Sequence, residues 1–365
     1  MERLNAHLAQ ELAARYRVIV VGPRGCSSLA ADDIIVYQAP GTSILVFLAW
    51  AAATSAWLAL RYRPAVILGG SGLVAPVVRL AAWLAAARAA VYLHGLDIIA
   101  DSSLYRRFWL PSIRGMHACM TNSRHTASLA RDAGVDSMTL AVIAPGVDVS
   151  HTGTAAGARE FRLTHALADA PLLLSVGRLT VRKGLAEFVA NALPAIVARH
   201  PSAILVVIGD DAPDAILKGN AGERDRIKAL AASLGLASNL RMLGPVPQAT
   251  LDSAYKASTV HVFPVRDVPG DVEGFGMVAI EAAANGLPTV AFATGGVPDA
   301  VATGISGLLV PAGDYPGFVA AVDELLRDGY EGHAASCRQF ASAFTWERFG
   351  GEARGVLDRL TSVSS

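Results

Sequence analysis

Two glutamates, Glu273 and Glu281, stand eight positions apart in a stretch that begins with glycines and continues with alanines. An apolar run over 259–264 precedes them and predicts a buried strand, and the alanines predict a helix. Glu273 is therefore expected at the mouth of a helix, where free backbone N–H groups favour anionic or hydroxyl-rich ligands. Eight helical residues would separate the carboxylates by about 12 Å. That distance approximates the gap between the sugar ring and the ribose of a sugar nucleotide; the alternative is one capping and one exposed acid.

Two cations form a second candidate site. Arg178 and Lys183 follow a predicted strand over 172–176 and are framed by Gly177 and Gly184. Fixed cations at a strand end can neutralise a departing diphosphate without a metal ion. The alternative is a pair of solvated loop charges.

A histidine provides the third candidate. His94 follows a predicted strand over 89–93 and is followed by Gly95, so we expect its side chain at a strand end. A single histidine there is more often structural than catalytic. Asp97 completes the local pattern and is equally suited to capping the loop.

These stretches resemble motifs of the family-4 retaining glycosyltransferases, which have the GT-B fold, and among them the bacterial mannosyltransferases. The resemblance covers nearly the whole chain from about residue 5, because the motifs occur in the family order. They are His94-Gly95-Leu96-Asp97, Asn122-Ser123, Pro145-Gly146-Val147-Asp148, Gly177-Arg178-Leu179, Lys183-Gly184, the segment 273–281, Gly295-Gly296-Val297-Pro298-Asp299 and the segment 304–310.

The resemblance implies a role for each candidate. It places Arg178 and Lys183 on the diphosphate of a sugar nucleotide, Glu281 on the ribose hydroxyls, and His94 opposite the donor sugar. It places Glu273 on the sugar and phosphate, together with nearby backbone. The residues implied to bind the donor are Gly177, Arg178, Lys183, Gly274, Phe275, Gly276, Met277 and Glu281, and those implied in catalysis are His94, Glu273, Arg178 and Lys183.

Short aliphatic runs alternate with alanine-rich helical stretches, which predicts an α/β protein with parallel sheets. Two doubly wound, Rossmann-like domains facing each other across a cleft would follow, as in the GT-B type. The predicted strands are Arg17–Val21, Ile34–Tyr37, Ala65–Leu68, Ala89–Leu93, Cys119–Asn122, Leu140–Ile143, Leu172–Val176, Ile204–Ile208, Leu240–Leu243, Val260–Phe263, Thr289–Phe292 and Leu308–Val310.

Three segments are expected. Residues 1–160 form an acceptor-side domain, 161–345 a nucleotide-sugar-binding domain, and 346–365 a helix that packs back toward the first domain. A polar stretch over 151–160 is expected to be the linker. Family members usually begin with a strand and a glycine-rich loop, whereas this sequence begins with a helix over 2–14. Either the start is late or the first strand is missing.

Composition restricts the partners. The 365 residues have a formal net charge of zero, so nothing indicates nucleic-acid binding. Residues 1–150 hold thirteen arginines and no lysine against nine acids, a surplus that could favour an anionic acceptor or a membrane surface. A randomly uneven surface is the alternative. Three widely spaced cysteines indicate reduced thiols in a cytoplasmic protein. A position at the inner face of the cell membrane is a separate expectation, in line with a membrane-peripheral enzyme.

An uncharged run over 44–60 is at the short limit for a membrane span. Its alanine, serine and threonine content favours a buried core helix instead, with a membrane-dipping surface as the alternative.

Two further patterns are set aside. Gly69-Gly70-Ser71-Gly72 lacks the spacing of a dinucleotide fingerprint. The acids of the segment 210–214 favour a solvated turn, and no metal site is expected.

The resemblance therefore implies a retaining hexosyltransferase that needs neither metal nor cofactor. Its expected partners are a nucleotide-sugar donor, GDP-mannose or a UDP-hexose, and a lipid-linked or polysaccharide hydroxyl acceptor. The alternatives are a nucleotide-sugar epimerase, a phosphorylase, or a truncated binding subunit without catalysis.

Overall fold

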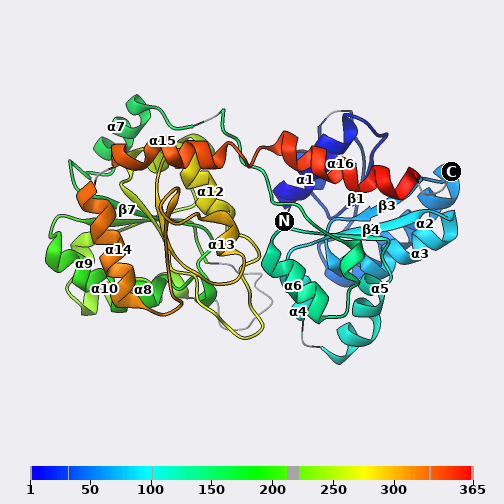
Figure 1. Cartoon of the computed structure of the whole chain (residues 1–365), viewed down its shortest axis with the longest axis horizontal. Coiled ribbons are helices and arrows are strands. Elements are labelled where there is room, and N and C mark those ends of the chain that lie inside the picture. Colours follow the sequence, from blue (N-terminus) through cyan, green and yellow to red (C-terminus); the bar gives the residue numbers. More distant parts are fainter. Residues whose placement is uncertain are drawn as a thin grey trace. The chain divides into compact units, whose positions relative to one another are not determined.

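The computed structural model describes residues 2–362 apart from 32, 101, 151, 212–221 and 329. It divides into two compact units. Unit 1 comprises Met1–Gly146 and Trp346–Ser365, and unit 2 comprises Val147–Thr345. Figure 1 shows the helices and strands of both units.

The predicted boundary at residue 160 is too late, and the predicted linker over 151–160 is largely helical. Helix α7 (Ala155–Thr164) packs against α11 (Gln248–Ala257) of unit 2. Phe161 of α7 is buried in the core of that unit. The helix therefore belongs to unit 2, because its apolar face is buried there. The first residue of the predicted linker lies outside the described residues.

Unit 2 is built around a six-stranded parallel sheet with the strand order β12-β11-β10-β7-β8-β9. The strands are β7 (Leu172–Val176), β8 (Ile204–Ile208), β9 (Leu240–Gly244), β10 (Val260–Phe263), β11 (Thr289–Phe292) and β12 (Gly307–Val310). The remaining helices are α8 (Leu185–Asn191), α9 (Leu193–Arg199), α10 (Glu223–Ser233), α12 (Met277–Ala284), α13 (Val297–Ala300), α14 (Tyr315–Asp328) and α15 (Tyr330–Ala341), with short helical turns η5 (Val181–Lys183) and η6 (Ala237–Asn239).

Both faces of this sheet are covered by helices. Side chains that alternate along β7 point to opposite faces, so Leu173 packs with α8, α9 and α14, whereas Leu172 and Leu174 pack with α7 and α11. Burial on both faces explains why the strands are continuous aliphatic runs. Unit 2 is therefore a doubly wound, Rossmann-like domain, as predicted.

Unit 1 contains the remaining six strands, all of them in parallel pairs. They are β1 (Ile19–Gly22), β2 (Ile35–Gln38), β3 (Val66–Gly69), β4 (Arg88–Leu93), β5 (Ala118–Thr121) and β6 (Leu140–Val142). The helices are α1 (Glu2–Ala13), α2 (Ile44–Tyr62), α3 (Ala75–Ala85), α4 (Leu96–Ile99), α5 (Leu110–Arg114), α6 (Arg124–Asp132) and α16 (Trp346–Ser362), with short turns η1 (Cys26–Leu29), η2 (Gly72–Val74), η3 (Tyr105–Trp109, a π-helical turn) and η4 (Ser137–Thr139).

The strands of unit 1 form two separate sheets, β1-β2 and β3-β4-β5-β6. In the doubly wound order the first strand lies between these two groups and joins them. Within the described residues no strand precedes α1, and neither β1 nor β3 has a second paired neighbour.

Helix α16 returns the chain to unit 1, where it packs against α1. Leu4, Leu8 and Leu12 of α1 share one buried cluster with Phe349 of α16 and with Tyr92 of β4. The residues of α1 recur every four positions, so one helical stripe is buried. Within the predicted segment 346–365, residues Trp346–Ser362 thus form a helix of the first unit.

The interpretation of residues 44–60 as a buried core helix is wrong. Residues Ile44–Tyr62 do form a helix that is long and apolar enough to cross a membrane. However, only 17% of its most apolar 18-residue stretch is buried. Ala51, Leu58 and Ala59 are buried, whereas Leu45 is 75% exposed. Composition predicted the helix correctly but could not reveal which neighbours would cover it.

Candidate functional site

The candidate site of unit 2 lies at the switch point of its sheet. Strands β7 and β10 are neighbours in the centre of the sheet, and the chain continues from them toward opposite edges. Ligands of doubly wound sheets bind beyond the carboxyl ends of strands at such a point. The segment after β7 carries Arg178 and Lys183, and the segment after β10 carries Glu273. The sequence candidates therefore come from the two strands that border this position.

A cluster of buried charges joins the two segments. The ammonium nitrogen of Lys183 lies 2.8 Å from Oε2 of Glu273, and Nη1 of Arg182 bonds the same oxygen. Arg182 also donates from Nε to Oδ1 of Asp271 over 2.8 Å. The Lys183 ammonium lies 4.7 Å from the ring centre of Phe263, a cation–π contact. Two cations thus hold one carboxylate at the switch point.

Burial and charge act in opposite directions on these groups. Burial raises the pKa of Glu273, but Lys183 and Arg182 lower it more, so the net pKa lies below its ordinary value. Burial lowers the pKa of Lys183 and Glu273 raises it, with a net decrease. For Arg182 the two carboxylates outweigh burial, and its pKa is raised. The charged form of the carboxylate is therefore favoured.

Glu273 does not lie at the mouth of the helix, where it was predicted. The helix begins only at Met277, because Gly276 has φ 103° and stands before it. Glu273 thus lies in the loop before α12, so the estimate of about 12 Å between the two glutamates does not apply. Its Oε2 is occupied by the two cations.

Close backbone packing fixes the loop that carries Glu273. The N–H of Gly296 donates to the carbonyl of Glu273 over 2.8 Å. A Cβ on Gly296 would stand 2.0 Å from the carbonyl oxygen of Gly274, so no side chain fits there. A Cβ on Gly276 would stand 2.9 Å from the ring of Phe263. The glycines therefore permit the loop to lie against its neighbours.

The other donor-binding candidates differ in what they present. The side chain of Phe275 is buried and packs against Phe344, so only its backbone could face a ligand. Met277 is half-buried as the first residue of α12. Gly177, with φ 132°, directly follows β7 and precedes Arg178, which is exposed. Arg178 is consequently the more accessible of the two predicted phosphate-binding cations.

Glu281 lies on α12 and is held by a tyrosine. The hydroxyl of Tyr255, on α11, donates to Oε2 of Glu281 over 3.0 Å. Tyr255 is buried, which fixes the direction from which it meets the carboxylate. The half-buried glutamate is thus oriented by a neighbouring helix.

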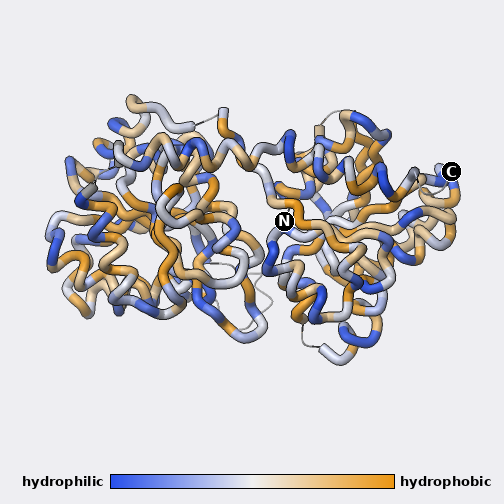
Figure 2. Tube along the Cα trace, viewed as in Figure 1, coloured by the Kyte–Doolittle hydropathy of each residue, from blue (hydrophilic) through white to orange (hydrophobic). Residues whose placement is uncertain are grey.

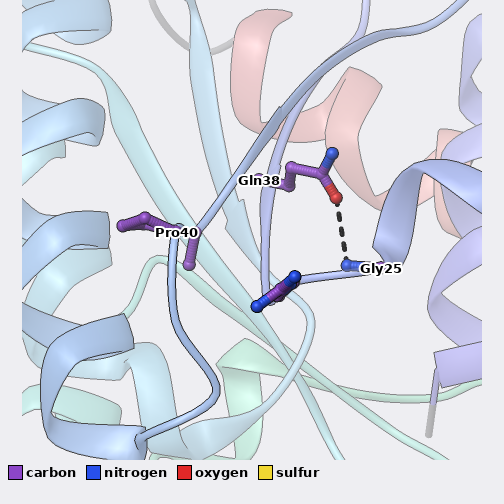
Figure 3. A pocket seen from close by; sticks show the side chains of 5 residues that line it. Gly25, Gln38 and Pro40 are labelled. Carbon is purple, nitrogen blue, oxygen red and sulfur yellow. Dashed lines mark hydrogen bonds between the residues drawn. The ribbon is translucent and has the colours of Figure 1, made fainter.

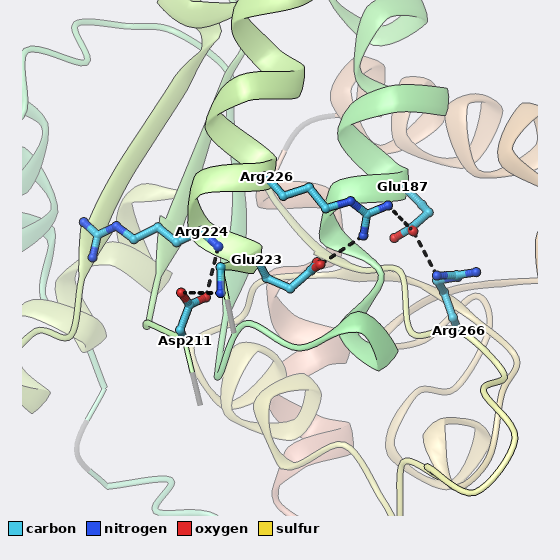
Figure 4. A network of polar contacts seen from close by, with 7 residues as sticks. Glu187, Asp211, Glu223, Arg224, Arg226 and Arg266 are labelled. Carbon is cyan, nitrogen blue, oxygen red and sulfur yellow. Dashed lines mark hydrogen bonds and ion pairs between the residues drawn. The ribbon is translucent and has the colours of Figure 1, made fainter. Parts of the chain in front are cut away.

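A further polar network connects the loops around the site (Figure 4). Oε1 of Glu187, on α8, accepts from Arg266 and from Arg226, each over 2.9 Å. The N–H of Arg266 donates to the carbonyl of Arg182 over 2.8 Å. The segment after β10 is therefore tied to the segment after β7 twice, through Glu187 and through the backbone.

The acids after β8 belong to the same region. Asp211 accepts from the N–H of Arg224 over 3.0 Å (Figure 4). Asp210 pairs with the guanidinium of Arg224 over 3.0 Å. The two acids therefore bind the start of α10. Asp214 of the same pattern lies outside the described residues. Among the described residues no group of three or more His, Cys, Asp or Glu could hold a metal ion.

His94 lies in unit 1, directly after β4. Its Nε2 lies 2.9 Å from the carbonyl oxygen of Gly70, and burial lowers its pKa. A carbonyl can only accept, so the neutral ring carries its proton on Nε2. Asp97 accepts from the N–H groups of His94, Gly95 and Gly72 at 2.8–3.0 Å, so it caps this loop.

Unit 1 also contains a separate pocket at the carboxyl ends of β1 and β2 (Figure 3). Its volume is about 420 Å³, and it is lined by Arg24, Gly25, Gln38, Ala39 and Pro40. The N–H of Gly25 donates to Oε1 of Gln38 over 3.0 Å. None of the predicted site residues lines this pocket.

Arg182, Asp271 and Tyr255 are members of the site that the sequence analysis missed. Arg182 precedes Lys183, and Asp271 stands two residues before Glu273. In the sequence, Arg182 and Asp271 were signalled only by their positions near these predicted site residues. The pairing of Arg182 with Asp271 spans 89 positions, so the fold was needed to reveal it.

Two family models match the chain in succession. Residues 159–343 match the glycosyl transferases group 1, and residues 1–151 match glycosyltransferase family 4. The first match alone covers half of the chain. The protein belongs to the group 1 glycosyl transferase family.

Named relatives agree with this assignment. A D-inositol 3-phosphate glycosyltransferase of Geodermatophilus obscurus is 38% identical over 221 residues, 59% of this chain and 46% of the relative. A GDP-mannose-dependent alpha-(1-6)-phosphatidylinositol monomannoside mannosyltransferase of Mycolicibacterium smegmatis is 31% identical over 209 residues, 56% of this chain and 52% of the relative. The matches span about half the length of these curated relatives.

Solved structures share the fold over almost the whole chain. HepE of Anabaena, in complex with UDP, superposes with a TM-score of 0.79 at 20% identity, covering 97% of this chain and 96% of that one. Sucrose-phosphate synthase of Thermosynechococcus elongatus gives 0.77 at 24% identity, covering 98% and 92%. The predicted GT-B fold class, with two Rossmann-like domains, is confirmed.

Proposed function

We propose that this protein is a retaining, metal-independent glycosyltransferase. It moves a hexose from a nucleoside-diphosphate sugar to a hydroxyl of a lipid-linked or polysaccharide acceptor. The observation that carries the proposal is the cluster of Lys183, Arg182 and Glu273 at the switch point of the sheet in unit 2. The names of two relatives add support, because one is a glycosyltransferase of inositol 3-phosphate and the other is GDP-mannose-dependent.

The cations of unit 2 would bind the donor diphosphate. During transfer the bond between the sugar and the diphosphate breaks, so negative charge grows on the leaving group. Arg178 is exposed in the segment after β7, and Lys183 of the same segment is bonded to Glu273. Fixed cations in such a position stabilise the transition state more than the ground state. The departing phosphate would take the proton of the acceptor hydroxyl.

The remaining contacts would orient the two ends of the donor. Glu281, oriented by Tyr255, would accept hydrogen bonds from the ribose hydroxyls. The backbone of 274–277 and the carboxylate of Glu273 would approach the sugar and phosphate. We propose that His94 takes part in the transfer of the hexose to the acceptor hydroxyl. The donor is GDP-mannose or a UDP-hexose, and no other cofactor takes part.

The proposed setting is the cytoplasm, at the inner face of the cell membrane. All three cysteines, Cys26, Cys119 and Cys337, are free thiols, which is compatible with a reducing compartment. A lipid-linked acceptor would be available at that surface.

The experiment incubates the purified protein with radiolabelled GDP-mannose or UDP-glucose and with lipid extracts or polysaccharide acceptors, in the presence of EDTA. We expect labelled product with the same anomeric configuration as the donor. Interconversion of the free nucleotide sugar would indicate an epimerase, and a requirement for inorganic phosphate would indicate a phosphorylase. Nucleotide binding without any turnover over the whole acceptor set would contradict a catalytic role.

A further inference from the structure

Helix α2 presents an apolar face to solvent. Leu45, Ala49, Ala53 and Trp57 recur every four residues, and all four are exposed. No charged residue occurs from 44 to 60. A surface helix of a globular protein normally carries its polar residues on this side. The exposed side of α2 is therefore apolar where water would favour polar residues.

The neighbouring helix α3 adds to this surface. It packs against α2, and its Leu80 is exposed while Trp83 is 77% exposed. Figure 2 shows both helices coloured mostly toward the hydrophobic end of the scale. We call this surface the docking face; it consists of Ile44, Leu45, Val46, Trp57 and Leu60 of α2 with Leu80 and Trp83 of α3.

Arginines gather where α2 ends. The guanidinium carbons of Arg17 and Arg61 lie 5.4 and 5.3 Å from the ring centre of Tyr62. Arg63 follows as the C-cap residue, and all three arginines are exposed. In the part of the chain that the structure describes, none of them forms an ion pair. Unit 1 as a whole holds sixteen arginines and no lysine against eleven acids.

We propose that the docking face binds the surface of an anionic lipid bilayer. Aliphatic side chains beside tryptophans, with arginines at the margin, match the acyl boundary and the phosphates of such a surface. The helix lies in the surface and does not span the bilayer, because Ala51, Leu58 and Ala59 remain packed inside unit 1. A second copy of the chain would bring the uncompensated arginines of two molecules together, which the charge disfavours.

What bilayer binding implies for the choice of acceptor rests on the proposed function. A protein held at the bilayer by unit 1 would meet acceptors that are anchored in the same membrane. Bilayer binding itself is independent of the transferase chemistry, since no donor-site residue of unit 2 belongs to the docking face.

The experiment measures co-sedimentation with phosphatidylglycerol-containing vesicles and with pure phosphatidylcholine vesicles. We expect binding to the anionic vesicles. The double variant Leu45→Gln/Trp83→Gln should bind about tenfold or more weakly, because two large apolar side chains no longer enter the bilayer. The double variant Arg61→Gln/Arg63→Gln should lose roughly fivefold for each arginine, and this difference should vanish at high salt.

Leu163→Gln is the matched control, because Leu163 is 82% exposed but lies on α7 of unit 2. It should bind vesicles like the wild type. Nucleotide titration without vesicles gives a separate reading of the proposed function, and all these variants should bind nucleotide normally.

Equal vesicle binding by the wild type and the Leu45→Gln/Trp83→Gln variant would overturn the proposal, as would an absence of binding. A wild-type dimer in light scattering would also overturn it, if the Leu45→Gln/Trp83→Gln variant were monomeric and no lipid binding occurred. If bound protein resisted extraction with alkaline carbonate, α2 would span the bilayer, and this result would contradict a helix that lies in the bilayer surface.

Discussion

At the residue scale, Arg178 and Lys183 carry the same charge but have different surroundings. Arg178 is exposed, whereas Lys183 is largely buried and bonded to Glu273. Their motif predicts two equivalent phosphate-binding cations. The structure separates them, since Lys183 also belongs to a buried cluster.

This difference predicts distinct outcomes for two alanine variants. Arg178→Ala should leave the free energy of unfolding within about 0.5 kcal/mol of the wild type. Lys183→Ala should lower it by about 1–3 kcal/mol, because it removes a hydrogen bond to a buried carboxylate. Both should reduce turnover more than donor affinity. Steady-state kinetics and chemical unfolding measure both effects, and unaltered kinetics in both variants would refute the assignment.

Glu281 predicts an effect on nucleotide affinity. Glu281→Ala should weaken donor binding by about 1.5–3 kcal/mol, the range for hydrogen bonds to a charged group. Tyr255→Phe should weaken it by about 0.5–1.5 kcal/mol, because the carboxylate loses the hydroxyl that orients it. Isothermal titration with nucleoside diphosphate compares the variants. An affinity equal to wild type in Glu281→Ala would count against the ribose contact.

A buried histidine predicts a dependence of stability on pH. Burial, with a smaller contribution from Lys183, lowers the pKa of His261 to about 3. The unfolded chain binds a proton near pH 6.5 that the folded chain does not, so stability falls as the pH drops from about 6.5 toward 3. In His261→Gln the slope of unfolding free energy against pH should be smaller by up to about 1.4 kcal/mol per unit. Circular dichroism in denaturant measures it; equal slopes would refute the prediction.

At the scale of elements, glycines determine how the loops after β7 and β10 meet. Gly184 has φ 69°, and a Cβ there would stand 2.1 Å from the carbonyl oxygen of Pro264. Gly235 has nearly the same φ, 71°, but no atom within 4 Å of a Cβ. An alanine would therefore meet the same backbone strain at both positions, but it would clash with a neighbouring atom only at position 184.

Alanine at these two glycines separates the effects. Gly235→Ala should cost about 1–2 kcal/mol of stability from its left-handed backbone alone. Gly184→Ala should cost a further 1–3 kcal/mol or so from the clash, and it should also weaken nucleotide binding because Lys183 is adjacent. Equal losses in the two variants would show that the close approach to Pro264 has no energetic effect.

The elements also show where sequence reasoning succeeds and where it stops. All twelve predicted strands occur within two residues of their expected bounds, because most of them are aliphatic runs bordered by turn residues. The start of α12 at Met277 was missed, since it depends on the positive φ of Gly276. The exposure of α2 was missed because hydropathy does not distinguish an apolar helix that is buried from one that is exposed.

At the scale of the whole molecule, the candidate residues are distributed over two compact units. Unit 2 contains the charged cluster at its switch point, and unit 1 contains His94, the docking face and an excess of arginine. Order along the chain predicted this division, but the partners of Glu273 could not be predicted. Arg182 and Lys183 are about ninety positions away from it and meet it only through the sheet order.

The most direct test of the donor site is a crystal structure of the complex with a nucleoside diphosphate. We predict phosphate oxygens within hydrogen-bond distance of Arg178 and Lys183, and ribose hydroxyls on the carboxylate of Glu281. A nucleotide bound away from the loops after β7 and β10, with Glu281 still bonded only within the protein, would contradict the account.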